Sequence, residues 1–449
     1  MRSRFVVIVI LLLVLGGWYG VLRIAADPGG DIGRYWYELF LAHVAVSYLA
    51  LLACYVVLGR DRWKTRLKKA VLSVAAVLAA MLLVELPAVL GWVDYRVVLV
   101  PKMAGGPGPH NRRFDKELIA VRPAYDHFIE RQPGDDVIGL AIPARPIYET
   151  EFRFDQNGFR NESDLDRATV VLLGDSFIEG YKTPQEDICS SQLARLLDTK
   201  VANLGQCGFG PPHELAALRR YGLKLSPEVV VWFFFEGNDL QNIDHYQGAV
   251  RDWEGFVRSE NAYRCRSFWL GTLEIVAFRL DQLRTQESAL ARRRSGLLLD
   301  AQGAESEKIY FGVPPFAVSA HELDLFAKLE KILWAARGLC QRNGIRFLVV
   351  NVPTKLRVYQ DLCRFPDDSD VPHWTLNDVP DRLAAWCDEA GIAYVDLTSA
   401  MKAAALTSAT GRGGPVYLPD DPHWSARGHA VVAGEIARWI RAANGSRDE

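Results

Sequence analysis

Three long apolar runs in the first hundred residues constrain the chain more than any other feature of its sequence. The runs cover residues 5–22, 39–58 and 70–93. Their only charged side chain is that of Glu85, and their only histidine is His43. Each run is long enough to cross a hydrocarbon layer about 30 Å thick as a helix. We therefore predict that residues 1–100 form a membrane anchor with three transmembrane helices, and that the function lies in the rest of the chain.

The basic residues around these runs predict their orientation. Arg2 and Arg4 precede the first run, and residues 60–69, between the second and third runs, are mostly basic. The loop between the first two runs balances its charges, with Arg23, Arg34, Asp27 and Asp31. Because short cytoplasmic loops carry an excess of Lys and Arg, we predict a cytoplasmic N-terminus. No small-residue cleavage site stands out after the first run, which favours a retained helix over a signal peptide. The predicted localisation is the cell (inner) membrane, with everything after residue 93 extracytoplasmic (periplasmic).

The charge balance argues against a nucleic-acid binder. The chain has 52 Lys and Arg against 54 Asp and Glu, a net charge of −2, whereas proteins that bind phosphates usually show a basic excess. No Cys-x-x-Cys pair or Cys/His cluster has the spacing of zinc ligands, so we predict neither a metal nor a cofactor. All cysteines except Cys54 fall on the oxidising side, where disulfides form, and their pairing stays open.

Beyond the anchor the sequence pattern changes twice. Residues 101–156 are rich in Pro and Gly, which predicts a linker and a small irregular subdomain. Residues 157–449 alternate apolar strands, loops and helices, which is typical of a parallel sheet with helices on both faces. The predicted strands are 169–173, 201–204, 229–235, 345–350 and 392–395. A long stretch at about 245–320 is predicted to be an insertion between the third and fourth strands.

Polar residues suited to acyl chemistry follow the first three strands, at the edge where open parallel sheets bind ligands. Ser176 lies in Gly-Asp-Ser-Phe at a strand-to-helix turn, where helix N–H groups favour a developing negative charge. Gly208, in Gly-Phe-Gly, lets backbone amides approach a ligand closely. Asn238, in Gly-Asn-Asp, carries a side-chain amide that can donate to an oxyanion.

A histidine near the C-terminus supplies what a serine nucleophile requires. Such a serine needs a base within hydrogen-bond reach, and the base needs an acid that orients it. His423 follows Asp420 and Asp421 in Asp-Asp-Pro-His-Trp, between the last predicted strand and the last predicted helix. From the residues alone, either aspartate can orient His423.

Taken together, these four blocks resemble the SGNH/GDSL hydrolase family, which is named for a Ser, a Gly, an Asn and a His in separate blocks. The matching residues are Ser176, Gly208, Asn238 and His423, and the resemblance covers about residues 157–440. It implies a flavodoxin-like three-layer α/β/α fold with a five-stranded parallel sheet. It also implies that Ser176 attacks an ester carbonyl while His423 acts first as general base and then as general acid. The amides of Ser176 and Gly208 and the side chain of Asn238 would form the oxyanion hole.

The last block is similar to one branch of this family, related to enzymes that O-acetylate polysaccharides of the bacterial envelope. Many family members place the orienting aspartate three residues before the histidine, which is Asp420 here. The Asp-x-His-Trp form of the branch corresponds to Asp421, and Trp424 and Gly428-His429 also fit it. We therefore favour Asp421, with Asp420 as the runner-up. In alginate acetylation proteins the Asp and His precede the Ser, whereas Ser176 comes first here, so the match to that subgroup is incomplete.

The expected function is that of a membrane-anchored serine esterase or O-acyltransferase acting on ester-linked acyl groups, with acetyl favoured, of an envelope glycan. One triad serves hydrolysis and transfer alike, so the sequence does not separate them. Two alternatives stay open: a non-catalytic glycan-binding or assembly protein on the same fold, and a lipase or thioesterase. Three spans are fewer than a membrane acyl-donor transporter needs, so a transferase would require a separate membrane partner.

Overall fold

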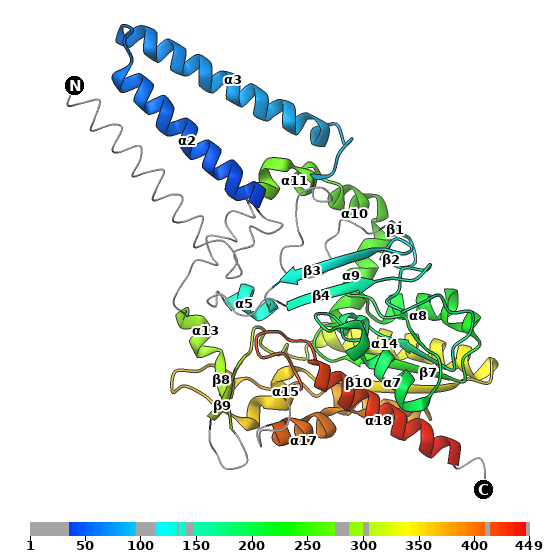
Figure 1. Ribbon diagram of the computed structural model, residues 1–449. Helices are drawn as coiled ribbons and strands as arrows, with labels where there is room; N and C mark the ends of the chain where they lie inside the picture. The colour runs from blue at the N-terminus through cyan, green and yellow to red at the C-terminus, as the bar shows by residue number, and fades with distance from the viewer. Residues whose placement is uncertain are drawn as a thin grey trace. The chain divides into compact units, whose positions relative to one another are not determined.

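The computed structural model describes residues 36–95, 113–132, 134–140, 148–273, 287–299, 305–408 and 414–445. The chain divides into two compact units (Figure 1). The first comprises residues 1–103 and 258–284, and the second comprises residues 104–257 and 285–449. Part of the stretch predicted as an insertion therefore groups with the N-terminal unit.

The described part of the N-terminal unit contains two long helices, α2 (Trp36–Leu58) and α3 (Trp63–Val89). By length and composition α3 can cross a membrane, and residues 44–58 of α2 form a shorter apolar stretch. The predicted span at residues 5–22 lies outside the described residues. The three-helix anchor therefore stays a prediction, with α3 as the helix that meets the length requirement within the described part.

Glu85, the acidic residue of α3, is only 5% exposed and has a partner within the same unit. Its Oε2 accepts the backbone N–H of Trp269 at 3.2 Å. The indole N–H of Trp269 donates to the backbone oxygen of Met81 at 3.0 Å. The segment that follows α11 (Tyr263–Arg266) thus binds one oxygen of the acid, while Oε1 of Glu85 is buried without a hydrogen-bond partner among the described residues.

The second unit is built on one sheet of five parallel strands, as the apolar runs predict. The strands are β5 (Val170–Leu173), β6 (Val201–Asn203), β7 (Val229–Phe235), β10 (Arg346–Val352) and β12 (Ala393–Asp396). Their order is β12-β10-β7-β5-β6, with every neighbouring pair parallel. Read from β6 this is the order 2-1-3-4-5 of flavodoxin-like folds, so the predicted fold class is confirmed. The chain order reverses between β5 and β7, and ligands bind at such switch points.

Helices cover both faces of the sheet because its strands are apolar on both sides. In β7, Val229, Val231 and Phe233 belong to one core cluster, while Val230, Trp232 and Phe234 belong to the other. The first cluster includes side chains from α7 (Cys189–Leu197), α17 (Thr398–Ser408) and α18 (Ala426–Gly445). The second includes side chains from α8 (Pro211–Arg220), α9 (Asp239–Arg251), α14 (Ala320–Arg342) and α16 (Val379–Glu389). This is the predicted α/β/α arrangement.

Smaller elements complete the described part of the chain. Within residues 101–156 the described elements are two antiparallel pairs, β1–β2 (Arg113–Asp115, Ile119–Val121) and β3–β4 (His127–Gln132, Tyr148–Arg153), and helix α5 (Asp135–Leu140). A further antiparallel sheet has the order β11-β8-β9 (Cys363–Arg364, Ser295–Leu299, Glu305–Tyr310). The remaining helices among the described residues are α6 (Ser176–Glu179), α10 (Trp253–Glu260), α13 (Ala289–Arg293) and α15 (Lys355–Tyr359). Short 3-10 turns lie at Gln185–Asp187, Gly222–Leu225, Gln360–Leu362 and Val371–His373. The seven cysteines, all within the described residues, form no disulfide bond with one another.

Candidate active site

Ser176, His423 and Asp421 form a continuous hydrogen-bonded chain at the carboxyl edge of the sheet. Ser176 is the first residue of α6, which starts three residues after β5 ends. Its Oγ lies 2.8 Å from Nε2 of His423. Nδ1 of His423 lies 2.6 Å from Oδ1 of Asp421, and the backbone N–H of His423 donates to the same oxygen at 2.9 Å. With the Nδ1 proton held by the carboxylate, Nε2 is left to accept the serine proton.

The two aspartates of the last block face different partners. Asp421 is the one beside His423. Oδ1 of Asp420 instead accepts the hydroxyl of Tyr148 at 2.5 Å. The other oxygen of Asp420 is buried without a hydrogen-bond partner among the described residues. The geometry therefore assigns the place beside the histidine to Asp421 and not to the runner-up, Asp420.

Two lysines and two aspartates hold the loop that carries Asp421. Lys182 donates to Oδ2 of Asp421 and to Oδ1 of Asp135, the latter at 2.5 Å. The backbone N–H of Asp135, the first residue of α5, also donates to Oδ2 of Asp421 at 2.8 Å. Lys355 donates to Oδ2 of Asp136 at 2.6 Å and to the backbone oxygen of Asp421 at 3.0 Å. Asp421 is thus fixed from α5, from the loop after α6 and from α15.

Three hydrogen-bond donors at the same sheet edge have no acceptor within the part of the chain that the structure describes. They are the backbone N–H groups of Ser176 and Gly208 and the side-chain amide of Asn238. The Ser176 amide is free because the first amides of a helix have no partner within it. Gly208 is exposed and has a φ of +81°, in the left-handed region that favours glycine. Asn238 is exposed at the start of α9, and its side chain does not cap that helix.

A buried ion pair fixes the turn that leads to Gly208. Oε2 of Glu179 accepts the backbone N–H of Cys207 at 2.7 Å, and Oε1 accepts Nε–H of Arg122 at 3.1 Å. Both charged side chains are almost completely buried. Because Glu179 belongs to the same short helix as Ser176, the pair couples the serine to the amide of Gly208.

The charges around His423 favour its protonated form and keep Asp421 ionised. Burial by itself lowers the pKa of His423, but the Asp421 carboxylate, together with Asp135, raises that pKa above its ordinary value. Burial by itself raises the pKa of Asp421, but the ammonium of Lys182 and the ring of His423 hold that pKa well below its usual range. An orienting acid must stay ionised to stabilise an imidazolium, and these groups meet that requirement.

A family model matches the C-terminal part of the chain. Residues 316–449 match the model described as "SGNH hydrolase-like domain, acetyltransferase AlgX". In this part the chain is similar to an SGNH hydrolase-like domain, and we call the unit that contains it, residues 104–257 and 285–449, the SGNH domain. The matched region includes β10, β12 and the block of Asp421 and His423, and it begins after Ser176, Gly208 and Asn238. The predicted family resemblance is thereby confirmed, and with it the enzyme class of an SGNH-type hydrolase or acyltransferase.

Solved structures resemble the chain weakly. A GDSL-like lipase from Bacteroides thetaiotaomicron is 15% identical over 61% of this chain and 88% of its own, with a TM-score of 0.30. The lipase/acylhydrolase from Enterococcus faecalis is 14% identical over 61% and 95%, with a TM-score of 0.29. A carbohydrate esterase family 2 enzyme from Corynascus thermopiles is 12% identical over 67% and 73%, with a TM-score of 0.30. A comparison with curated proteins found no match.

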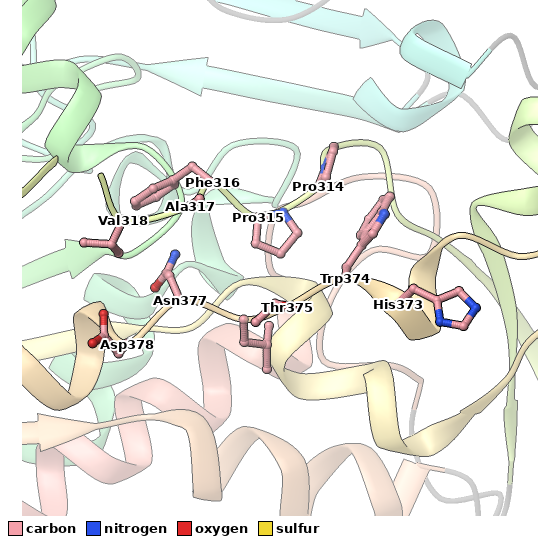
Figure 2. A pocket seen from close by; sticks show the side chains of 11 residues that line it. Pro314, Pro315, Phe316, Ala317, Val318, His373, Trp374, Thr375, Asn377 and Asp378 are labelled. Atoms are coloured by element: carbon pink, nitrogen blue, oxygen red, sulfur yellow. The ribbon is translucent and has the colours of Figure 1, made fainter. Parts of the chain in front are cut away.

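A pocket of about 470 Å³ lies at the same edge of the SGNH domain (Figure 2). Its walls are residues 314–318, which come just before α14, and residues 373–378, which come just before α16. A helix that joins two parallel strands begins at the carboxyl edge of the sheet, so both walls lie on the side of Ser176. Figure 2 shows the two segments running side by side, with Pro315 and Phe316 on one and Trp374 and Asn377 on the other.

Arg357 connects this pocket to the turn that carries Asn238. Its guanidinium donates to the backbone oxygen of Asn377 in the pocket wall at 2.7 Å. The same guanidinium contacts both carboxylate oxygens of Glu236 at 2.8 and 2.7 Å. Glu236 is buried and precedes Asn238 by two residues, so one ion pair supports both the pocket wall and the predicted oxyanion donor.

Asp135, Asp421 and His423 bring potential ligand atoms within 4.8 Å of one another, as in some metal sites. However, Lys182 donates to both carboxylates. The two ring nitrogens of His423 face Asp421 and Ser176. Because a metal ion would have to displace the ammonium of Lys182, these residues do not fit a metal site.

Four residues that surround the histidine block were not predicted from the sequence: Asp135, Asp136, Tyr148 and Lys182. Their contacts with the block join positions more than two hundred residues apart. The adjacent acids Asp135 and Asp136 are a local signal, but such a pair also suits an ordinary helix start. Gly134 is a second signal, because a Cβ at that position would lie 2.0 Å from the backbone oxygen of Asp420.

Burial raises the pKa of three carboxyl groups near the serine, those of Asp175, Glu214 and Asp239. Neither carboxyl oxygen of Glu214 has a hydrogen-bond partner among the described residues. Burial, and then the charges of Asp239 and Asp175, raise the pKa of Glu214 well above its ordinary value. Burial raises the pKa of Asp175 to about 6. Glu214 therefore keeps its proton in the folded protein at pH values where an exposed glutamate is ionised.

Replacing Glu214 by glutamine should stabilise the SGNH domain progressively as the pH rises. The folded state retains a proton at Glu214 that the unfolded state releases above a pKa of about 4.3. In the wild type this group therefore lowers the free energy of unfolding by about 1.4 kcal/mol for each pH unit between that value and the raised pKa of the folded state. Thermal melts from about pH 5 to about pH 8 should show the difference in melting temperature between Glu214→Gln and wild type rising with pH. The exposed Glu162→Gln is the control without such a trend, and a flat difference for Glu214→Gln would contradict the prediction.

Proposed function

We propose that the protein is an extracytoplasmic, membrane-anchored serine esterase or O-acyltransferase that moves an acetyl group from or to a hydroxyl of an envelope glycan. The observation that carries the proposal is the chain of contacts from Ser176 Oγ through His423 to Asp421. A serine hydroxyl with a histidine at 2.8 Å and an ionised acid behind that histidine is the arrangement that activates a serine.

The proposed reaction uses these residues in two steps. Nε2 of His423 takes the proton of Ser176 while Oγ bonds to the ester carbon, and the carbonyl oxygen becomes an oxyanion. The amides of Ser176 and Gly208 and the side chain of Asn238 donate to that oxyanion. His423 then gives its proton to the departing alkoxide, which leaves an acyl group on Ser176. In the second step His423 removes a proton from a sugar hydroxyl or from water, that oxygen attacks the acyl carbon, and Ser176 recovers its proton.

Two observations support a small acyl group and a glycan. The family model that matches residues 316–449 is named for an acetyltransferase, which supports acetyl as the group transferred. The pocket beside the Asn238 turn combines apolar side chains with the amide of Asn377, a mixture that suits the ring and hydroxyls of a sugar.

The proposed location and partner follow from the N-terminal unit. We propose that α3 is one of three membrane-spanning helices and that the basic residues 60–69, just before α3 and in its first turns, keep this end of the helix in the cytoplasm. The SGNH domain then faces the extracytoplasmic side. A transferase there would receive its acyl group from a separate membrane protein that brings the donor across.

The test is turnover of an acetyl ester by the full-length protein in detergent, with and without a short oligosaccharide acceptor. We expect release of 4-nitrophenol from 4-nitrophenyl acetate, and loss of that turnover in His423→Ala. Acetylated sugar detected by mass spectrometry would identify a transferase, whereas acetate alone would identify an esterase. Faster turnover of a long-chain ester would instead favour a lipase. A folded wild type that neither turns over ester nor reacts with a fluorophosphonate would overturn the proposal and favour a non-catalytic role.

A further inference from the structure

Lys182 occupies an unusual position directly behind the Ser176–His423–Asp421 chain. Its ammonium donates to Oδ2 of Asp421, the oxygen that does not face the histidine. It also donates to Oδ1 of Asp135 at 2.5 Å. The side chain of Lys182 is 1% exposed, and that of Asp135 is 27% exposed. A buried charge is costly unless it is paired, so both contacts are needed to hold this ammonium in place.

Lys182 also lies at a strained position of the backbone. Lys182 has a φ of +60°, in the left-handed region where glycine is favoured. A residue with a Cβ in that region costs about 1 kcal/mol or more, and such strain concentrates at functional sites. Glycine would relieve the strain at Lys182 but would remove the ammonium from Asp421.

The charges of this group balance when His423 is protonated. Asp421 and Asp135 each carry one negative charge and Lys182 carries one positive charge. Their net charge is therefore negative by one unit, which a single imidazolium neutralises. Without Lys182, two carboxylates would face the ring and hold its proton more tightly. Without Asp135, the ammonium would cancel the charge of Asp421 and the ring would lose its proton more easily.

We propose that Lys182 and Asp135 form a charge-balancing pair behind the triad, which sets the pH range in which His423 works as a base. Both are positioning residues, since neither contacts Ser176 or the ring of His423 through a described hydrogen bond. Their charges act on the ring through space, and Lys182 also acts through its hydrogen bond to Asp421. The inference rests on the proposed function, because it concerns the base of that reaction. It extends the site by a lysine and an acid that the four sequence blocks do not contain.

Other groups around His423 do not duplicate this pair. The titratable or charged groups that face the ring, besides the pair itself, are Asp421 on its own loop, Asp175 before α6, His429 on α18 and Tyr181 after α6. Burial lowers the pKa of His429 to about 3, so this ring stays neutral. Burial raises the pKa of Tyr181, so the phenol also stays neutral. Asp175 is common to all the variants below and does not change their comparison.

The test compares the titration of His423 in full-length wild type, Lys182→Met, Asp135→Asn and the double variant. NMR of protein labelled with ¹³C at histidine Cε1 reports this pKa directly, and His423→Ala assigns the signal. We expect Lys182→Met to raise the pKa of His423 by about one unit and Asp135→Asn to lower it by about one unit. The double variant should return close to the wild-type value, because one negative charge again faces the ring. The rate of ester hydrolysis should increase with pH as His423 loses its proton. The midpoint of that increase should shift in each variant by as much as the pKa of His423 that NMR reports.

The variants keep the local structure as far as substitution allows. Asparagine at position 135 retains the backbone N–H that donates to Asp421, and methionine retains most of the length of Lys182. Lys402→Met, which breaks an exposed ion pair with Asp361, is the matched control and should leave the titration unchanged.

Opposite shifts that cancel in the double variant would support the pair, because a loss of packing has no reason to cancel. Shifts of the same sign, or no shift in either single variant, would overturn it. The NMR readout does not need turnover. A wild type without activity would therefore refute the proposed function while the titration still decides the role of the pair.

Discussion

Ser176→Ala should lower kcat for acetyl-ester hydrolysis by about 10⁴- to 10⁶-fold. The substitution removes the oxygen that would carry the acyl group, and no other described hydroxyl is hydrogen-bonded to His423. The residual rate would come from substrate binding and the oxyanion donors alone. The fold should survive, because the hydrogen bond of the Ser176 hydroxyl in this structure is the one to His423. Turnover and covalent labelling by a fluorophosphonate measure the effect independently.

Ser190→Ala is the matched control for this substitution. Ser190 is also buried, but its Oγ accepts the side-chain amide of Asn203 at 3.3 Å and takes no part in the triad. We expect this variant to keep wild-type labelling and turnover within a few-fold. Labelling that persists in Ser176→Ala, or loss of labelling in Ser190→Ala alone, would show that another serine is the nucleophile.

Asp421→Asn should lower kcat by about 10⁴-fold, while Asp420→Asn should lower it less than about tenfold. Four groups face the carboxylate of Asp421, and all four donate to it. They are the ring Nδ1–H and backbone N–H of His423, the ammonium of Lys182 and the backbone N–H of Asp135. An asparagine amide in either orientation would turn an N–H group toward one of these donors. The variant would therefore disfavour the tautomer of His423 that leaves Nε2 free for the serine.

Asp420 provides the internal comparison because it lies next to Asp421 in the chain and is equally buried. Its carboxylate accepts a hydrogen bond from the hydroxyl of Tyr148. The side-chain oxygen of an asparagine can accept the same hydrogen bond. Steady-state kinetics above the pKa of His423, with thermal melts to match stability, measure the two variants side by side. Equal losses in both variants would mean that the loop as a whole, and not Asp421, supports the histidine.

The layered fold and the four site blocks could be predicted because their signals lie in consecutive residues. A strand buried on both faces must be apolar at every position, and Val229–Phe235 shows this without reference to the rest of the chain. Helix α17 leaves no such signal, since it consists largely of small residues without a clear apolar stripe. The antiparallel pairs before β5 were also not foreseen, because they lie among prolines and glycines that favour irregular structure.

The sequence by itself determined the five-stranded sheet, the place of Ser176 and His423 at its edge and the enzyme class. Only the tertiary structure decided which aspartate faces His423, and that Lys182 and Asp135 stand behind it. Apolar periodicity is a local property, whereas these contacts join residues 239 and 286 positions apart. Whether a side chain in a loop points to the histidine or to a tyrosine depends on how α5, the loop after α6 and α15 pack around that loop. That packing is a product of the folded domain and leaves no periodic pattern in the chain.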